Sequence, residues 1–236
     1  MSSATPRETV SSATAGAAGP PAADRAYHHV KSGLLDGSYL DGDLLSEGEV
    51  ANALQMSRTP VREAFLRLQT EGFLRLYPKR GALVVPVTPT EARAVMEARL
   101  ALESFAIDKL ASQGREAMVA IGEQLTAHPA CHGAGLSDAE IHVTDRAFHA
   151  TLVAAAGNPV VADLYNALRD KQMRITATAR THAVRPRITH QHAQLAAAIR
   201  VGDPELAKDR LREHLLGTVR ALGVAGGPYL EPIAEL

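Results

Sequence analysis

The chain has 236 residues, of which 46% are hydrophobic, so it can bury the core of one large domain or of two smaller ones. Its formal net charge of −1 creates no general attraction to nucleic acid, so any such affinity must come from the placement of charges. A single cysteine excludes a disulfide framework and fits a reducing cytoplasm. No apolar run approaches the roughly 18 residues of a membrane span, so we expect no membrane partner.

The first 24 residues are mostly serine, alanine, threonine, glycine and proline, without hydrophobic periodicity or the apolar core of a signal peptide. We therefore expect residues 1–24 to be a disordered tail. From Arg25 onward, helical spacing of apolar residues predicts a short amphipathic helix that ends near Gly37 and carries Tyr27, Val30, Leu34 and Leu35. After a loop, Ser46 is a suitable cap for a second helix, whose apolar residues are Val50, Ala51 and Leu54.

The stretch from Met56 to Gly72 has the pattern of a helix that enters a groove of DNA. Ser57 is expected to cap it and Gly72 to end it, and one face carries the apolar residues Val61, Ala64, Phe65 and Leu68. The other side of its first turns carries a cluster of Arg58, Thr59 and Arg62. Two guanidinium groups one turn apart at the front of a helix suit the major groove. Together with the preceding helix, this stretch predicts a helix-turn-helix motif.

Two β-rich runs, 73–77 and 82–85, flank a turn of Pro78-Lys79-Arg80-Gly81 and predict a hairpin with a basic tip, a wing. Between Ser57 and Arg80, six basic residues stand against two acidic ones, a local excess of four positive charges. A basic run is usually only a solvated face. Here it falls on the two elements that a winged helix-turn-helix directs at phosphates, so we favour DNA binding.

After the stiff connector Pro86-Val87-Thr88-Pro89, the chain has the pattern of successive helices. We expect them at about residues 90–112, 115–126, 138–156, 160–180, 186–201 and 204–222. A loop at 128–135 and a sharp break at 157–159 interrupt them. The predicted fold is therefore mainly α. It comprises a winged helix-turn-helix domain with a small β-hairpin wing at 25–87, an all-helical bundle domain at 88–226 and a tail at 227–236.

Polar residues stand on helix faces that should be buried in the second domain. Asp145 and His149 share the apolar face of one helix, His192 lies on that of another, and His214 flanks the apolar residues of the last. Burying such groups is costly unless they share a partner, and one carboxylate with three imidazoles suits a divalent metal. Each residue taken alone is more often a satisfied core or surface residue. His142, near the same face, is an alternative ligand.

An inward-facing arginine could bind a carboxylate effector, and Arg99 is the candidate because it lies on an apolar face. The alternative is an intrahelical pair between Arg99 and Glu103. Three further arginines are weaker candidates that we expect to face solvent, namely Arg146, Arg169 and Arg174.

The segment Ser57-Arg58-Thr59-Pro60-Val61-Arg62-Glu63-Ala64, with Leu68, Glu71-Gly72 and Arg80-Gly81, resembles the GntR family of bacterial transcription regulators over about residues 25–87. The resemblance implies a DNA-binding set of Ser57, Arg58, Thr59, Arg62, Lys79, Arg80 and Gly81, with the wing in the minor groove. One departure is Gly48, where many relatives have an arginine. That difference removes one expected phosphate or base contact and bears on operator sequence and affinity.

The helical part resembles the effector-binding FCD domain of the FadR subgroup, in its six-helix, VanR-like variant. The resemblance rests on Asp145-x-x-Phe148-His149, Gly157-Asn158, His192-x-x-Leu195-x-x-Ala198-Ile199-x-x-Gly202-Asp203 and His214. It implies a divalent metal held by Asp145, His149, His192 and His214, with zinc the first choice and nickel or manganese as alternatives. It also implies an effector that is a small organic acid or a sugar acid.

We therefore predict a ligand-responsive, DNA-binding transcription regulator, a repressor in most relatives, that acts as a homodimer on a palindromic operator in the cytoplasm. An enzyme with a catalytic metal is an alternative, but it would need a general base near the metal, and the sequence offers no convincing one. A DNA-binding adaptor whose helical half only dimerises is the other alternative.

Overall fold

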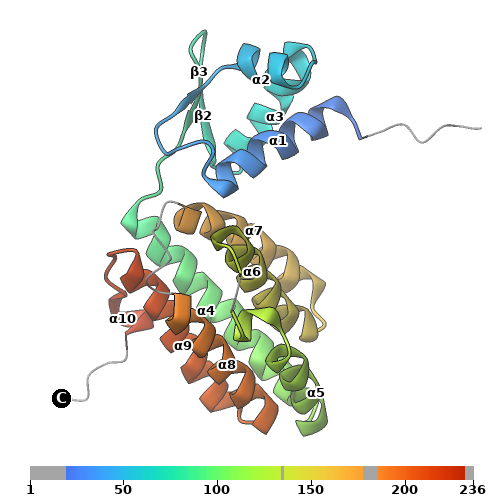
Figure 1. The fold of residues 1–236 in the computed structure, drawn as a ribbon, viewed down its shortest axis with the longest axis vertical. Helices are drawn as coiled ribbons and strands as arrows, with labels where there is room; N and C mark the ends of the chain where they lie inside the picture. The colour runs from blue at the N-terminus through green and yellow to red at the C-terminus, as the bar shows by residue number, and fades with distance from the viewer. Residues whose placement is uncertain (1–19, 134–135, 178–184, 232–236) are drawn as a thin grey trace, which may run out of the picture.

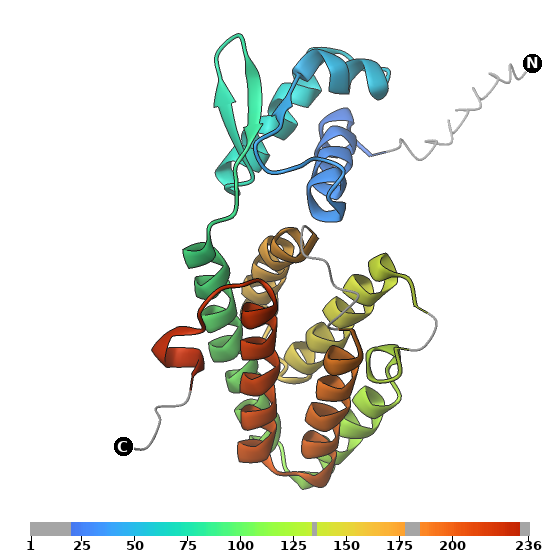
Figure 2. The same ribbon diagram turned by 60° about the vertical axis from the view of Figure 1, so that its left-hand side comes forward.

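The computed structural model describes residues 20–133, 136–177 and 185–231. Figures 1 and 2 show a smaller N-terminal part, built of short helices and a small sheet, beside a bundle of longer helices. The chain passes from the sheet directly into α4, Pro89–Ser112, which runs through the bundle. The predicted mainly α fold, with a winged helix-turn-helix followed by a helical domain, is confirmed.

The N-terminal part packs three helices against a three-stranded antiparallel sheet. The helices are α1 (Ala22–Asp36), α2 (Glu47–Ala53) and α3 (Arg58–Thr70). The strands, in sheet order β1-β3-β2, are β1 (Leu44–Leu45), β3 (Gly81–Val84) and β2 (Leu74–Tyr77). The predicted apolar face of α3 is completely buried, and α1 packs against it. This burial aims the opposite, basic side of α3 away from the core.

Three details of this part differ from the sequence-based expectation. α1 begins at Ala22, inside the stretch expected to be disordered. β1 lies in a stretch expected to be loop, because its pairing with β3 is a long-range contact that two residues cannot signal. Ser57 occupies the cap position of α3, but its hydroxyl accepts no hydrogen bond from the helix. Ser46 does cap α2, accepting from the amide of Gly48 at 3.2 Å.

The other long helices of the bundle, in chain order, are α5 (Arg115–Thr126), α6 (Asp138–Ala155), α7 (Pro159–Ala177), α8 (Arg185–Val201) and α9 (Pro204–Ala221). α4 lies in the middle of the bundle and packs against α5, α6, α7 and α9. α5 and α8 pack closely at Gly122, where a Cβ atom would stand 2.3 Å from the backbone of Arg200. Only glycine allows this approach.

Two short helices add to the six predicted ones. A single 3-10 turn, η1 (Pro129–Cys131), lies in the expected loop. α10 (Gly227–Leu230) lies in the expected tail, and its Leu230 is fully buried in the bundle core. The last three residues predicted for the helix at 160–180 lie outside the described residues. Within the described ranges, no helix combines the length and the apolar composition that crossing a membrane requires.

Candidate metal centre and DNA-binding surface

Three helices of the bundle bring four ionisable side chains together in its interior. Asp145 and His149 stand one turn apart on α6, His192 comes from α8 and His214 from α9. We call these residues the four-residue cluster. Each offers one ligand atom, and these four atoms all lie within 4.8 Å of one another. The three histidines are fully buried. The sequence-predicted set therefore converges, whereas the alternative ligand His142 lies outside it.

Hydrogen bonds at the far side of two imidazoles fix which nitrogen faces the cluster. His149 Nδ1 lies 2.6 Å from Glu103 Oε2, and His192 Nδ1 lies 3.3 Å from the carbonyl oxygen of Ala130. A carboxylate and a carbonyl only accept, so both Nδ1 atoms must carry the hydrogen. When both rings are neutral, the two Nε2 atoms present lone pairs to each other at 3.2 Å, and either a proton or a metal cation between them relieves the repulsion. His192 Nε2 also lies 3.2 Å from Asp145 Oδ1. With Nδ1 bound at the far side, both rings have the orientation expected of metal-binding histidines.

The protonation states also suit a cation. Burial lowers the pKa of His149 to about 4, in spite of Glu103, and burial together with the neighbouring imidazoles holds the pKa of His214 well below its usual range. Burial would raise the pKa of Asp145, but the Arg169 guanidinium together with the His192 and His149 imidazoles holds that pKa well below the usual range. At neutral pH the cluster therefore offers one carboxylate and at least two neutral imidazoles, all competent metal ligands.

Buried charged side chains surround the four-residue cluster and pair with two of its members. Arg99 is fully buried, and its Nε donates to Glu103 Oε1 at 2.8 Å, so the intrahelical pair weighed from the sequence is present. Burial would raise the pKa of Glu103, but Arg99 and His149 lower it to about 2. Arg169 donates from Nη2 to Asp145 Oδ2 at 2.6 Å. Both arginines also donate to the amide oxygen of Gln172.

Two of the arginines expected to face solvent are buried. Arg169 is 1% and Arg174 is 6% exposed, because acidic partners reach them from other elements: Asp145 on α6 and Asp41 in the loop before β1. The pattern of one helix cannot reveal such partners. Glu103, Arg169 and Gln172 were thus missed as neighbours of the cluster. The only available signal for Glu103 was its spacing of four residues from Arg99.

Among the described residues, one small pocket of about 10 Å³ reaches Asp145 and His192, and its other walls include Thr144, Ile188 and Thr189. That volume holds about one water molecule. An organic ligand would fit this particular pocket only if its side chains moved.

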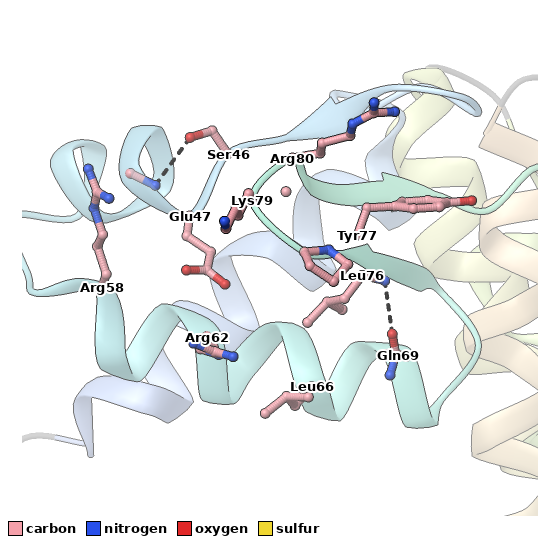
Figure 3. A pocket seen from close by; sticks show the side chains of 13 residues that line it. Ser46, Glu47, Arg58, Arg62, Leu66, Gln69, Leu76, Tyr77, Lys79 and Arg80 are labelled. Carbon is pink, nitrogen blue, oxygen red and sulfur yellow. Dashed lines mark hydrogen bonds between the residues drawn. The ribbon is translucent and has the colours of Figure 1, made fainter.

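The basic side of α3 and the wing together line an open groove of about 550 Å³. Figure 3 shows side chains from α2, α3 and the wing around it. Its basic residues are exposed in the groove, namely Arg58, Arg62, Lys79 and Arg80. Glu47 is the acidic residue in the same lining. Ser57 and Thr59 are exposed at the front of α3, as the sequence pattern requires.

Two glycines of this groove have structural reasons of their own. At Gly81, φ is 108° and a Cβ atom would stand 2.3 Å from the carbonyl oxygen of Leu45, so close pairing with β1 requires glycine. At Gly48, a Cβ atom would lie 3.2 Å from Nη2 of Arg58. The Arg58 guanidinium therefore lies over the position at which a longer side chain was expected.

Family comparisons agree with this two-part organisation. Residues 22–84 match the model of the bacterial regulatory proteins of the gntR family, and residues 94–217 match that of the FCD domain. This chain belongs to the GntR family. GntR-family proteins with this domain pair are transcription regulators rather than enzymes, and DNA binding is the function of the N-terminal domain.

Individual GntR-family relatives are similar over much of the chain. An uncharacterised HTH-type regulator from Agrobacterium vitis is 32% identical over 134 residues, which are 56% of this chain and 78% of the relative. The gluconate operon transcriptional repressor of Bacillus subtilis is 28% identical over 149 residues, 61% of this chain and 59% of the repressor. A putative GntR regulator from Rhodococcus has the same fold, with a TM-score of 0.69 at 20% identity, covering 85% of this chain and 97% of that one.

Proposed function

We propose that this GntR-family regulator represses its target genes and releases its operator when a small carboxylate binds at a divalent metal in the FCD domain. The observation that carries the sensing half is the convergence of four ligand atoms within 4.8 Å of one another inside the bundle, with the Nε2 atoms of His149 and His192 3.2 Å apart. A purely structural dimerisation domain does not require such a buried set of ligand atoms. Asp145, His149, His192 and His214 would hold the metal, and zinc suits three imidazoles and one carboxylate, with nickel or manganese also compatible.

The charge balance around the four-residue cluster favours an anionic effector. Among the described residues next to it, the cations Arg99 and Arg169 are balanced by the anions Glu103 and Asp145. A bound divalent metal adds two positive charges to this buried site, and a buried charge is costly unless it is paired. A metal with four protein ligands keeps positions for further oxygen ligands if its coordination is octahedral, and a carboxylate would supply them.

Arg99 is our candidate for the second contact with the effector. Arg99 and Arg169 converge on one neutral acceptor, the amide oxygen of Gln172. A carboxylate oxygen accepts more strongly from a guanidinium than an amide oxygen does. An effector carboxylate could therefore replace Gln172 there.

The DNA-binding half of the proposal uses the groove of α3 and the wing. Arg58, Thr59 and Arg62, with Ser57, would contact the operator in the major groove, while Lys79, Arg80 and Gly81 would lie at the minor groove. A homodimer would place two such surfaces on a palindromic site. A regulator of this kind works in the bacterial cytoplasm, where its operator is.

The test is a gel-shift titration of zinc-loaded protein on its operator with a panel of small organic acids and sugar acids. We expect at least one acid to weaken operator binding by about 5- to 150-fold, the usual range of allosteric coupling. Arg99→Gln should reduce this response while leaving operator binding without effector unchanged. If no acid weakens binding, the proposed direction of sensing is wrong.

A further inference from the structure

The helical domain holds the DNA-binding domain through two ion pairs on one face of α7. Asp170 and Arg174 stand one turn apart on this helix. Asp170 Oδ2 lies 2.9 Å from Lys31 Nζ on α1, and Arg174 Nη2 donates to Asp41 Oδ1 at 2.8 Å. In both Figure 1 and Figure 2, α1 lies next to the end of the bundle that contains α7, and the two helices are in contact. We call Lys31, Asp41, Asp170 and Arg174 the interdomain clamp.

The two pairs have opposite polarity, which selects one orientation of the domains. The acid is on α7 in one pair and on the DNA-binding domain in the other. A shift by one turn along α7 would bring like charges together, and like charges at close range disfavour the shifted arrangement. The side chains of Lys31, Asp170 and Arg174 are between 7% and 17% exposed and that of Asp41 is 31% exposed. Solvent therefore screens the Lys31–Asp170 pair less than an ordinary surface pair.

The interdomain clamp contacts the short segment that joins the two DNA-contacting elements, α3 and the wing. Lys31 Nζ lies 5.5 Å and the Arg174 guanidinium 5.9 Å from the centre of the Phe73 ring. Phe73 lies between the end of α3 and the start of β2. Asp41 also accepts a hydrogen bond at 3.0 Å from the amide of Val87, in the connector to α4. Loosening the interdomain clamp would therefore change the position of α3 and the wing relative to the helical domain.

The same helix pair links the clamp to the four-residue cluster. Asp145 and Arg146 are neighbours on α6, and they pair with neighbours on α7: Asp145 with Arg169 at 2.6 Å and Arg146 with Asp170 at 2.7 Å. Asp170 thus divides its two oxygens between Arg146 and the clamp residue Lys31. Asp145 is therefore paired with a residue of α7 that directly precedes the clamp residue Asp170.

We propose that the interdomain clamp fixes the orientation of the DNA-binding domain and that the Asp145–Arg169 pair controls how tightly it holds. When Asp145 is drawn away from Arg169, α7 loses one of its two ion pairs with α6, the clamp loosens and the two domains move more freely. The first part stands on contacts within this chain. The second deepens the proposed function, because Asp145 is a ligand of the proposed metal.

Hydrogen exchange on full-length, chelator-treated protein tests the clamp directly, because the Val87 amide donates to Asp41 in the closed arrangement. Arg174→Gln and Asp170→Asn should each speed exchange at Val87 and in α1 by about fivefold, the effect of one good ion pair. The matched controls Arg212→Gln and Asp209→Asn alter a more exposed pair within α9 and should change nothing there. Equal exchange in clamp and control variants would overturn the clamp.

The coupling is tested in the same metal-free protein, so that its failure is separate from any failure to bind metal. Asp145→Asn should speed hydrogen exchange at Val87 as the clamp variants do. If Asp145→Asn does not fold, Arg169→Gln removes the same ion pair and should have the same effect. Thr144→Val is the control, since the Thr144 hydroxyl donates to carbonyls of its own helix. Faster exchange in the clamp variants alone would overturn the coupling, whereas the metal content of the wild type tests the proposed function independently.

Discussion

At the scale of single residues, Glu103 has the most consequential position in the helical domain. It is fully buried, and its two oxygens are divided between Arg99 and His149. One oxygen therefore balances a buried cation, and the other fixes the orientation of a proposed metal ligand. Replacing the Glu103 carboxylate by an amide therefore weakens both interactions.

Glu103→Gln should lower the free energy of unfolding by roughly 3–5 kcal/mol, because it leaves the Arg99 charge buried and unpaired. Urea unfolding of metal-free protein measures the change. Glu205→Gln is the matched control, since the Glu205 side chain is 80% exposed in its pair with Lys208 and should cost at most about 1 kcal/mol. Similar losses in the two variants would show that Arg99 finds another partner.

Acid should destabilise the metal-free protein well before its carboxylates titrate. The pKa of His149 is lowered to about 4, so between the ordinary value of 6.5 and about 4 the unfolded chain binds a proton that the folded chain does not. Stability therefore falls as pH falls through this window, by about 2 kcal/mol at pH 5 for this residue. Urea unfolding at pH 7 and pH 5 should show a smaller difference in His149→Gln than in the wild type. The exposed His28 provides the control, and His28→Gln should behave as the wild type.

At the scale of elements, local signals predict most of the helices. Capping residues and proline mark where helices begin: Ser137 and Glu140 form a capping box at the start of α6, and Asp203 caps the start of α9 before Pro204. The four-residue cluster was predictable for a related reason, because the apolar face of each helix fixes which polar residues turn inward. Pairings between elements were not predictable in this way. β1, the buried Arg169 and the short α10 each depend on a partner far away in the sequence.

α3 offers the sharpest test at this scale. Arg62 is exposed in the groove between α3 and the wing, one turn after Arg58. Arg62→Ala should weaken specific operator binding by roughly 1–3 kcal/mol if its guanidinium reads a base. Arg80→Ala, on the wing, should instead weaken binding to all sequences and reduce its salt dependence. Arg212→Ala, on the far-off α9, should leave operator affinity unchanged. Equal affinity for Arg62→Ala and the wild type would mean that another element reads the operator.

At the scale of the whole molecule, regulation requires coupling between two sites, the buried four-residue cluster that could hold a cation and the open basic groove. α6 and α7 lie between them, since α6 carries Asp145 and α7 carries the residues that hold the DNA-binding domain. A small shift of these two helices would change the position of α3, and in the proposed homodimer it would do so in both chains. Coupling of this kind needs two discrete arrangements of a packed unit.

The account depends above all on the four-residue cluster holding a metal, and elemental analysis of purified protein measures this directly. We predict about one divalent metal per chain in the wild type, zinc foremost, as four ligands of this kind imply. In His192→Ala most of that metal should be lost while operator affinity without effector stays near the wild-type value. Equal metal content in wild type and variant, or none in either, would contradict the account.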